Sequence, residues 1–204
     1  MGAAAERAAS VRRELRILLS LRVLPVRVAR FFWRAWRHAW RTGDRFSLVS
    51  PARPAELADL LALARGRRAV VELGTGTAWS AISLLLAQPA CRVISCDPCV
   101  RVEREAYLDL AGHNVRERIE LRREPDGAGP RAGDPPVELL FIDSSHERAP
   151  TVAAFRAWRA ALAPAAIVVF HDHGNPRYPG VREAVEELEL PGHASGSLFV
   201  WHAP

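Results

Sequence analysis

Val-Val-Glu-Leu-Gly-Thr-Gly-Thr-Ala-Trp, residues 70–79, is the stretch that decides the fold of this chain. The apolar run that enters it, residues 69–73, has the length of a buried strand. Gly74 and Gly76 let the backbone turn sharply and approach a ligand without a Cβ in the way. From Thr77, a good helix-capping residue, the chain continues with apolar side chains at helical spacing. A strand, a glycine turn and a helix in this order surround a small ligand with backbone N–H groups.

The spacing of the glycines separates two kinds of cofactor. The dinucleotide fingerprint G-x-G-x-x-G would need its third glycine at Trp79, where an indole blocks close packing of the helix on the strand. The alternative pattern, acid-x-G-x-G-x-G, is met by Glu72, Gly74 and Gly76, with Ala78 at the third position. The carboxylate of Glu72 would repel a pyrophosphate and favour a cation such as S-adenosylmethionine, which carries an ammonium and a sulfonium group. A glycine turn without any ligand is the structural alternative.

This pattern resembles motif I of the class I S-adenosylmethionine-dependent methyltransferases. The resemblance implies S-adenosylmethionine as the cofactor and an acid at the end of the second strand for its ribose. Asp97, which follows a predicted strand over residues 92–96, matches that acid, although an aspartate before a proline also suits a simple turn. Asp126 lies in a Pro- and Gly-rich loop that the resemblance places near the adenine. The cofactor-binding residues implied are Glu72, Gly74, Thr75, Gly76, Ala78, Trp79, Asp97, Asp126 and Asp143.

Two more apolar strands are predicted, over residues 137–142 and 166–170, and polar residues follow each of them. The first runs into Asp-Ser-Ser-His at 143–146 and the second into His-Asp-His at 171–173. Between them a helical pattern continues until Pro164. Continuous apolar strands that alternate with helices indicate a parallel sheet buried on both faces. Because ligands bind beyond the carboxyl ends of such strands, we expect the acids and histidines to meet at one edge of the sheet.

The run FIDSSHERAPTVAAFRAWRAALAPAAIVVFHD, residues 141–172, resembles one methyltransferase subfamily in particular. Its members carry Ile-Asp-Gly-x-His, a helix with an inward tryptophan, Pro-Gly-Gly and a strand that ends in His-Asp. With motif I and Asp97, the resemblance covers residues 55–202. It implies a single α/β domain, a Rossmann-like three-layer sandwich with a mostly parallel seven-stranded sheet.

Related small-molecule O-methyltransferases bind a divalent cation at the ends of the fourth and fifth strands. By position, the resemblance implies that Asp143, His171 and Asp172 would bind it, a ligand set that suits Mg²⁺, Mn²⁺ or Fe²⁺. The ion would hold a substrate hydroxyl and lower its pKa, and His146 or His173 would take the proton. The catalytic residues expected are therefore Asp143, His146 and His173.

The chain departs from the subfamily at the serines that follow Asp143. Ser144 replaces the family glycine, and Ser145 stands where many members have a second aspartate. The loss of that carboxylate weakens the acidic cluster. The alternative to a metal site is therefore that Asp143 and His171 serve as hydrogen-bond anchors at the strand ends, without an ion.

Charge divides the chain into an arm and a domain. All 28 basic residues are arginine, and the formal net charge is +5. Residues 1–42 hold ten arginines against two glutamates, a net charge of +8, whereas residues 43–204 hold eighteen arginines against 21 acids, a net charge of −3. We therefore expect a basic helical arm over residues 1–42, frayed at its first ten residues, and a mildly acidic S-adenosylmethionine-binding domain over residues 43–204.

The second half of the arm predicts a basic amphipathic helix over residues 26–41, and a first helix is expected from Val11 to the break at Pro25. One face carries Arg27, Arg30, Arg34, Arg37 and Arg41, and a neighbouring stripe carries Val28, Phe32, Trp36 and Trp40. We favour packing of the aromatic stripe on the domain, as a lid over the substrate site or in a homodimer. The alternatives are a peripheral contact of residues 11–41 with an anionic membrane surface, and binding of nucleic acid, which is the least favoured.

Composition and spacing exclude several other classes. With 49% hydrophobic residues the chain is not disordered, and no apolar run approaches the ~20 residues of a membrane span. Arginines interrupt the N-terminal apolar part, which argues against a signal peptide. Cys96 and Cys99 lack the second pair that a zinc site needs, so we expect reduced cysteines in a cytoplasmic, bacterial protein.

Together these features predict an enzyme that methylates an oxygen of a small molecule with S-adenosylmethionine, with Mg²⁺ or another divalent cation as a candidate second cofactor. Two alternatives stay open. One is a non-catalytic protein that uses the fold or the arm to bind a membrane or a partner. The other is an RNA methyltransferase that uses the Arg-rich arm. Against base methylation of RNA, Asp-Ser-Ser-His at 143–146 replaces the Asn/Asp-Pro-Pro motif common in such enzymes.

Overall fold

The computed structural model describes residues 15–204. The fraying expected at residues 1–10 and the helix start expected at Val11 lie outside them. Residues 15–20 are helical. Helices follow as η1 (Leu21–Val23), α2 (Val26–Thr42), α3 (Arg45–Val49), α4 (Pro54–Leu63), α5 (Trp79–Ala87), α6 (Arg104–Ala111), α7 (His113–Arg116), η2 (Asp126–Ala128), α8 (Arg148–Arg159) and α9 (Pro179–Glu187). The strands are β1 (Ala69–Leu73), β2 (Arg92–Cys96), β3 (Ile119–Arg122), β4 (Val137–Ile142), β5 (Leu162–Phe170), β6 (His193–Ser195) and β7 (Leu198–His202).

The strands form one seven-stranded sheet in the order β3-β2-β1-β4-β5-β7-β6. The first five strands pair in parallel, and the β6–β7 hairpin adds two antiparallel strands beside β5. The order reverses between β1 and β4, so their carboxyl ends open at one edge of the sheet, where ligands bind in folds of this kind. The predicted Rossmann-like, mostly parallel seven-stranded sheet is confirmed.

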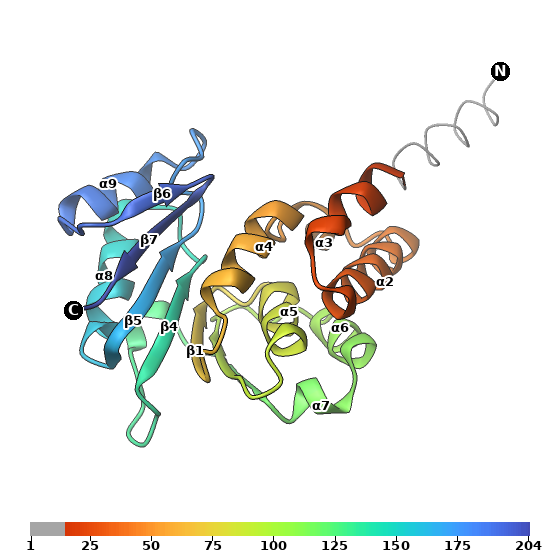
Figure 1. Ribbon diagram of the computed structural model, residues 1–204, viewed down its shortest axis with the longest axis horizontal. Helices are drawn as coiled ribbons and strands as arrows, with labels where there is room; N and C mark the ends of the chain where they lie inside the picture. The colour runs from red at the N-terminus through yellow and green to blue at the C-terminus, as the bar shows by residue number, and fades with distance from the viewer. Residues whose placement is uncertain (1–14) are drawn as a thin grey trace.

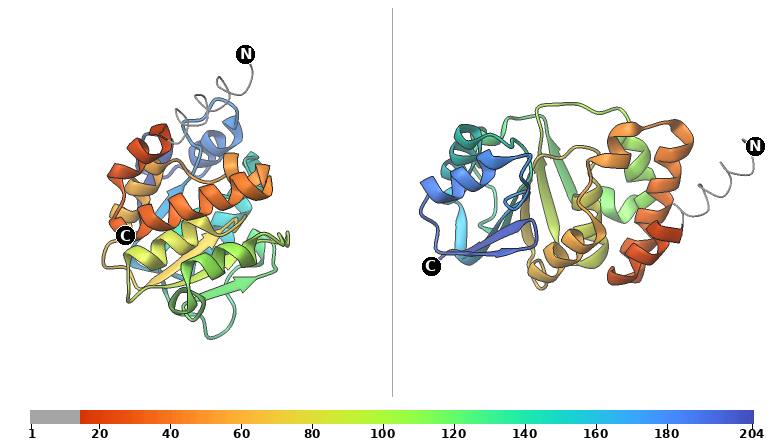
Figure 2. Two further views of the ribbon diagram at one scale, coloured as in Figure 1. Left: turned by 90° about the vertical axis from the view of Figure 1, so that its right-hand side faces the viewer. Right: turned by 90° about the horizontal axis from the view of Figure 1, so that it is seen from above.

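Helices cover both faces of the sheet, as the predicted three-layer sandwich requires (Figures 1 and 2). Leu57, Ile82 and Leu108 represent α4, α5 and α6 in the hydrophobic cluster on one face. Phe155 of α8 and Val181 of α9 belong to the cluster on the other face. Such continuous burial on both faces explains why the central strands read as apolar runs rather than as alternating patterns.

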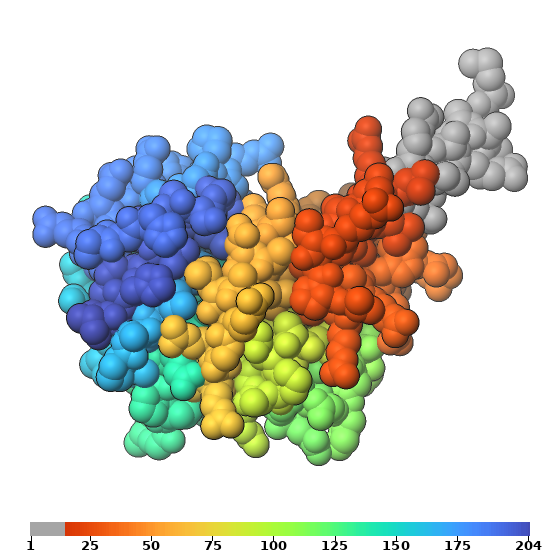
Figure 3. Space-filling model, in the orientation of Figure 1, coloured from red at the N-terminus to blue at the C-terminus, as the bar shows by residue number. Residues whose placement is uncertain are grey.

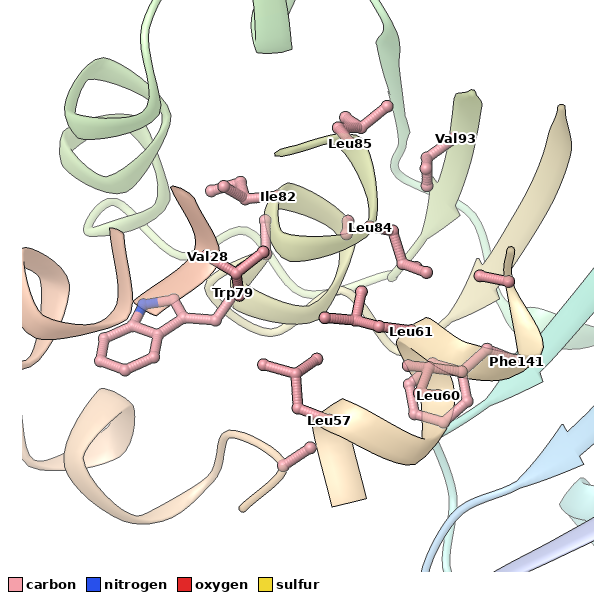
Figure 4. Packing of buried hydrophobic residues seen from close by; sticks show 14 of the residues in the cluster. Val28, Leu57, Leu60, Leu61, Trp79, Ile82, Leu84, Leu85, Val93 and Phe141 are labelled. Carbon is pink, nitrogen blue, oxygen red and sulfur yellow. The ribbon is translucent and has the colours of Figure 1, made fainter. Parts of the chain in front are cut away.

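The basic helix α2 packs outside the layer formed by α5 and α6 (Figure 2). Its aromatic stripe is part of the main hydrophobic core, since Val28, Phe32 and Trp36 are all at least nine-tenths buried. Figure 4 shows Val28 next to Trp79, the first residue of α5. Most of the aromatic stripe therefore packs on the domain as expected, but Trp40 is 47% exposed and no residue of α2 lines the cleft described below, so the lid over the substrate site is not borne out. Gly43 ends the helix in a left-handed conformation with φ +73°.

The end of α8 differs from the sequence prediction. A helical pattern was expected to continue until Pro164, but the helix ends at Arg159 and β5 begins at Leu162. Ala165 has φ +56°, and the pairing register with β4 shifts along this part of the strand. The strand therefore accommodates the proline in an irregular first half, where a missing backbone N–H costs little.

Candidate functional site

The glycine turn after β1 leaves no room for a side chain. Gly74 has φ +99°, and a Cβ built there would lie 2.1 Å from the backbone oxygen of Asp143. Its N–H donates to the carbonyl of Cys96 at 2.8 Å, and the N–H of Asp143 donates to Leu73 at 2.8 Å. Gly74 therefore lets the ends of β1, β2 and β4 approach one another closely. Gly76, with φ +50°, faces the ring of Phe46.

Glu72 is fully buried beneath this turn. Its carboxylate accepts a hydrogen bond from Ser95 Oγ at 2.5 Å and another from Ser80 Oγ, and Ser95 also bonds Thr75 at 2.7 Å. Burial, aided by the negative charge of Asp143, raises the pKa of Glu72 to about 7. Glu72, which the sequence assigned to the cofactor, therefore stabilises the glycine turn through hydrogen bonds with the hydroxyl groups of Ser80 and Ser95.

A cleft of about 800 Å³ opens at the carboxyl ends of the strands, within the usual size range of small-molecule sites. Ten of the residues singled out in the sequence line it: Gly74, Thr75, Gly76, Trp79, Asp97, Asp126, Asp143, His146, His171 and Asp172. Glu72 and Ala78 lie beneath its surface and are buried. The remaining walls come from the α3–α4 segment and from the loop between β5 and α9. In Figure 3, α4 reaches the surface between the N-terminal helices and the C-terminal half of the chain.

Asp97 and Asp126 lie on the side of the cleft next to the glycine turn. Asp97 Oδ2 accepts from the N–H of Gly76 at 2.9 Å, and its Oδ1 accepts from the N–H of Cys99 at 2.8 Å. Asp126 Oδ1 is buried without a hydrogen-bond partner among the described residues, and so is the hydroxyl of Ser144. Burial and the charge of Asp97 raise the pKa of Asp126, and the neighbouring Ser144 hydroxyl offsets part of this rise. Unpartnered buried acceptors are costly, so this wall fits a ligand with N–H donors, such as the amino group of adenine.

His171 occupies the floor of the cleft among three carboxylates. Its Nδ1 lies 2.9 Å from Asp143 and 3.3 Å from Asp172, and its Nε2 lies 3.5 Å from Glu56 of α4. These three carboxylates hold the imidazole ring from both of its nitrogens. Burial alone would lower the pKa of His171, but the carboxylates, Asp143 foremost, raise it well above its usual range.

A candidate metal site lies beside His171. Asp143, His146 and Asp172 each offer a ligand atom, and these atoms lie within 4.8 Å of one another. Two carboxylates and an imidazole suit Mg²⁺, Mn²⁺ or Fe²⁺. The resemblance implied His171 as the imidazole ligand, whereas this grouping contains His146, whose Nε2 lies 3.0 Å from Asp172 Oδ2. Burial would raise the pKa of Asp172, but hydrogen bonds from His146, His171 and Asn175 lower it strongly.

The two histidines expected to take the proton lie in different places. His146 lines the cleft and stacks on Tyr178 with ring centroids 3.8 Å apart. His173 lies outside the cleft, where its ring packs on Phe199 at 4.9 Å. Burial, with a contribution from Arg182, lowers the pKa of His173. The structure thus brings His146, and not His173, to the acids at the strand ends.

Several residues of the cleft had no signal in the sequence. Glu56 accepts hydrogen bonds from Ser197 Oγ at 2.6 Å and from the N–H of Arg53 at 2.8 Å while it faces His171. Burial would raise its pKa, but these hydrogen bonds and His171 lower it to about 2. Ser197 and Tyr178 come from the C-terminal part of the chain and reach the cleft only through the topology. A local motif could not have found them.

Comparisons with known proteins give a family and a shared fold. A family model described as "Methyltransferase domain" matches residues 71–173, half of the chain. Among solved structures, an O-methyltransferase from Streptomyces achromogenes involved in tomaymycin synthesis, in complex with S-adenosylmethionine, has a TM-score of 0.62 at 20% identity, covering 88% of this chain and 91% of its own. A TDP-rhamnose 3′-O-methyltransferase of calicheamicin biosynthesis has a TM-score of 0.62 at 15% identity, covering 99% of both chains.

An O-methyltransferase from Bacillus cereus in complex with S-adenosylhomocysteine has a TM-score of 0.60 at 16% identity, covering 84% of this chain and 91% of its own. At these identities the likeness shows the fold. No curated protein matches the sequence significantly. Within residues 15–204, none of the helices combines the length and the apolar character needed to cross a membrane.

Proposed function

The chain belongs to the methyltransferase-domain family, and from this premise we propose that it transfers the methyl group of S-adenosylmethionine to an oxygen atom of a small molecule. The observation that carries the proposal is the cleft at the carboxyl ends of β1, β2, β4 and β5. It brings together acids that suit a nucleoside, Asp97 and Asp126, and an acid–histidine cluster of Asp143, His146, His171 and Asp172. The similar solved structures, which are O-methyltransferases by name, support oxygen as the acceptor atom.

We assign the cofactor to the wall that contains the glycine turn. Asp97 would accept a hydrogen bond from the ribose hydroxyls, since its Oδ1 accepts only one hydrogen bond, from the N–H of Cys99, and keeps a free lone pair. Asp126 would accept from the amino group of adenine. The backbone of Gly74, Thr75 and Gly76, with Ala78 and Trp79 at the start of α5, would surround the rest of the molecule, and Glu72 would support it from below.

The methyl group is already reactive in the sulfonium, so the protein contributes mainly position and proton removal. The acceptor hydroxyl would lie beside Asp143 and His146. As the C–S bond breaks and the C–O bond forms, His146 would take the hydroxyl proton and S-adenosylhomocysteine would leave. Asp172, at 3.0 Å from Nε2, would orient the imidazole and stabilise its charged form. The stack on Tyr178 would hold the ring plane.

A divalent cation is the alternative way to activate the hydroxyl. Asp143 and Asp172 would hold it, with His146, or His171 as the resemblance implied, as the imidazole ligand. When bound, such an ion supplies a positive charge that lowers the pKa of the acceptor hydroxyl. Activity that survives extensive EDTA treatment would favour His146 as the base. Activity that is lost and then restored by Mg²⁺ or Mn²⁺ would favour the ion.

The test of the function is methyl transfer from radiolabelled S-adenosylmethionine to a panel of catechols, phenols and sugar hydroxyls. Labelled methyl ethers formed by the wild type, and not by Asp97→Ala, would support the proposal. Transfer to amines or to RNA, with no ether product, would contradict oxygen as the acceptor atom.

The basic arm carries a separate proposal about partners. Around the start of α2, Leu15, Leu18, Leu19, Val23 and Val26 are exposed large hydrophobic residues, and α2 itself carries Arg27, Arg30, Arg34, Arg37 and Arg41. We propose that residues 11–41 of a cytoplasmic enzyme can touch an anionic membrane surface. Sedimentation with vesicles containing phosphatidylserine, compared with phosphatidylcholine vesicles, tests this, and equal partition into both would contradict it. RNA that binds with a steep salt dependence would instead favour the RNA alternative.

The same apolar residues suit a homodimer, which is the second use that we propose for the arm. Sedimentation equilibrium of the whole protein, compared with Leu19→Glu, separates the two uses. A dimer that the glutamate dissociates would support self-association. A wild type that stays monomeric would contradict it.

A further inference from the structure

Arg104, the first residue of α6, is a buried cation to which the mechanism above gives no role. Its side chain is only 10% exposed. Two nitrogens of the guanidinium donate hydrogen bonds to the carbonyl oxygen of Gly76, Nε at 3.0 Å and Nη2 at 2.8 Å. Nη2 also lies 3.2 Å from the carbonyl oxygen of Cys99 and 3.3 Å from Asp97 Oδ2.

These contacts join the two turns that we assign to the cofactor. Gly76 lies in the turn after β1, and Asp97 and Cys99 lie in the turn after β2. Asp97 in turn accepts from the backbone N–H groups of Gly76 and Cys99. Arg104 and Asp97 therefore hold both the N–H and the carbonyl of Gly76 in one closed network. This network fixes the direction in which the carboxylate of Asp97 faces the cleft.

The chemistry of the side chain matters for this task. A guanidinium presents several donors in a rigid plane, so it can serve two carbonyls and a carboxylate at once. An ammonium group in its place would keep the charge but lose the fixed geometry. The positive charge also compensates a carboxylate that is 12% exposed, where an uncompensated charge is costly.

We propose that Arg104 is a positioning residue of the cofactor site, which holds Gly76 and Asp97 in the arrangement that receives the ribose of S-adenosylmethionine. The inference rests on the proposed function, because it assumes that Asp97 meets the ribose. It adds a residue outside motif I and outside the acid–histidine cluster. It also gives α6 a function, since the first residue of this helix closes the network between the two turns.

The chain offers a matched control in Arg118. This side chain donates to the backbone carbonyls of Leu85, Gln88 and Cys91 at 2.9 to 3.2 Å, so it also braces the backbone. These carbonyls lie at and beyond the carboxyl end of α5, outside the cleft lining. Loss of Arg118 should therefore lower stability without changing cofactor affinity.

The experiment is calorimetric titration of the full chain with S-adenosylhomocysteine and with S-adenosylmethionine. We expect Arg104→Met to raise both dissociation constants by about tenfold or more, since charge-assisted hydrogen bonds that order the ribose acid are lost. Arg104→Lys should raise them as well, by a smaller factor. Arg118→Met should leave both unchanged. Equal factors for the two ligands are expected because the ribose is common to them.

A second measurement separates positioning from plain structural support. Because Arg104 and Asp97 belong to one network, the double variant Arg104→Met/Asp97→Asn should lose less S-adenosylhomocysteine affinity than the sum of the two single losses. Additive losses would overturn the proposal, as would an unchanged dissociation constant in Arg104→Met. If the methionine variant fails to fold, Arg104→Lys decides by the same criterion. A wild type that binds neither ligand would instead refute the proposed function.

Discussion

Gly74→Ala would bring a new Cβ nearer to another atom than alanine would at any other glycine within the described residues. The new methyl carbon would lie 2.1 Å from the carbonyl oxygen of Asp143, 2.6 Å from its carbonyl carbon and 2.8 Å from Cα of Ser144. All three are backbone atoms, so no side-chain rotation relieves the clash, and β1 must move away from β4. We expect overpacking of this kind to cost about 1–3 kcal/mol, and the left-handed conformation at φ +99° adds about 1 kcal/mol more.

The assay is urea unfolding followed by tryptophan fluorescence, with Gly66→Ala as the matched control. Gly66 has φ +79° with nothing within 4 Å of its Cβ position. Alanine at this position therefore measures the cost of the left-handed backbone conformation without any steric clash. Gly66→Ala should lose about 1 kcal/mol, and Gly74→Ala should lose clearly more and also fail to bind S-adenosylhomocysteine. Equal losses in the two variants would refute the close approach of β1 and β4.

Three further outcomes are expected. Burial raises the pKa of Glu72 from 4.5 to about 7, so the folded protein keeps a proton that the unfolded chain has released. The unfolding free energy should therefore fall by about 3 kcal/mol between pH 4.5 and pH 7 in the wild type relative to Glu72→Gln; parallel pH profiles would contradict this. Phe32→Ala removes a buried ring that meets Trp79 edge-on at 5.0 Å and should cost about 3–5 kcal/mol in urea unfolding, whereas a loss below 1 kcal/mol would mean that α2 is not part of the core. Asp172→Asn should lower methyl transfer by about 100-fold with unchanged S-adenosylhomocysteine affinity. A parallel loss of affinity would contradict the assignment of Asp172 to the orientation of His146 rather than to the cofactor.

The sequence predicted the sheet and its ligand edge well, for a physical reason. Strands buried on both faces are continuous apolar runs, and polar residues at their ends stand out against them. Asp97, Asp143 and Asp172 were found in this way, and all three line the cleft. The predicted end of α8 was wrong, because Leu162 fits the apolar face of a helix as well as it fits a buried strand.

Side chains that reach the cleft from distant segments could not be predicted. Glu56 belongs to an ordinary capping pattern at the start of α4, and only the fold brings it to His171. Arg104 looks like one surface arginine among many in a chain whose basic residues are all arginine. That His146 lines the cleft and His173 does not depends on the direction in which the chain turns after each strand. The spacing of apolar residues in the sequence carries no information about that direction.

The role of the arm could be predicted only in part. Its aromatic stripe indicated a packed face, and Phe32 and Trp36 do lie in the core. The function of the neighbouring arginine face depends on partners, which the sequence of this chain alone does not reveal. The boundary proposed at residue 42 likewise remains a proposal, because α2 shares its hydrophobic cluster with α5 and α6.

The most direct test of the central claim, that this cleft binds S-adenosylmethionine for methyl transfer, is calorimetric titration of the wild type with S-adenosylhomocysteine beside Asp97→Ala. We predict one site per chain with a dissociation constant of about 1–100 µM, which corresponds to a binding free energy of about −5.5 to −8.2 kcal/mol, and no detectable binding by the variant. Absence of binding by a folded wild type, or equal binding by both proteins, would contradict the account.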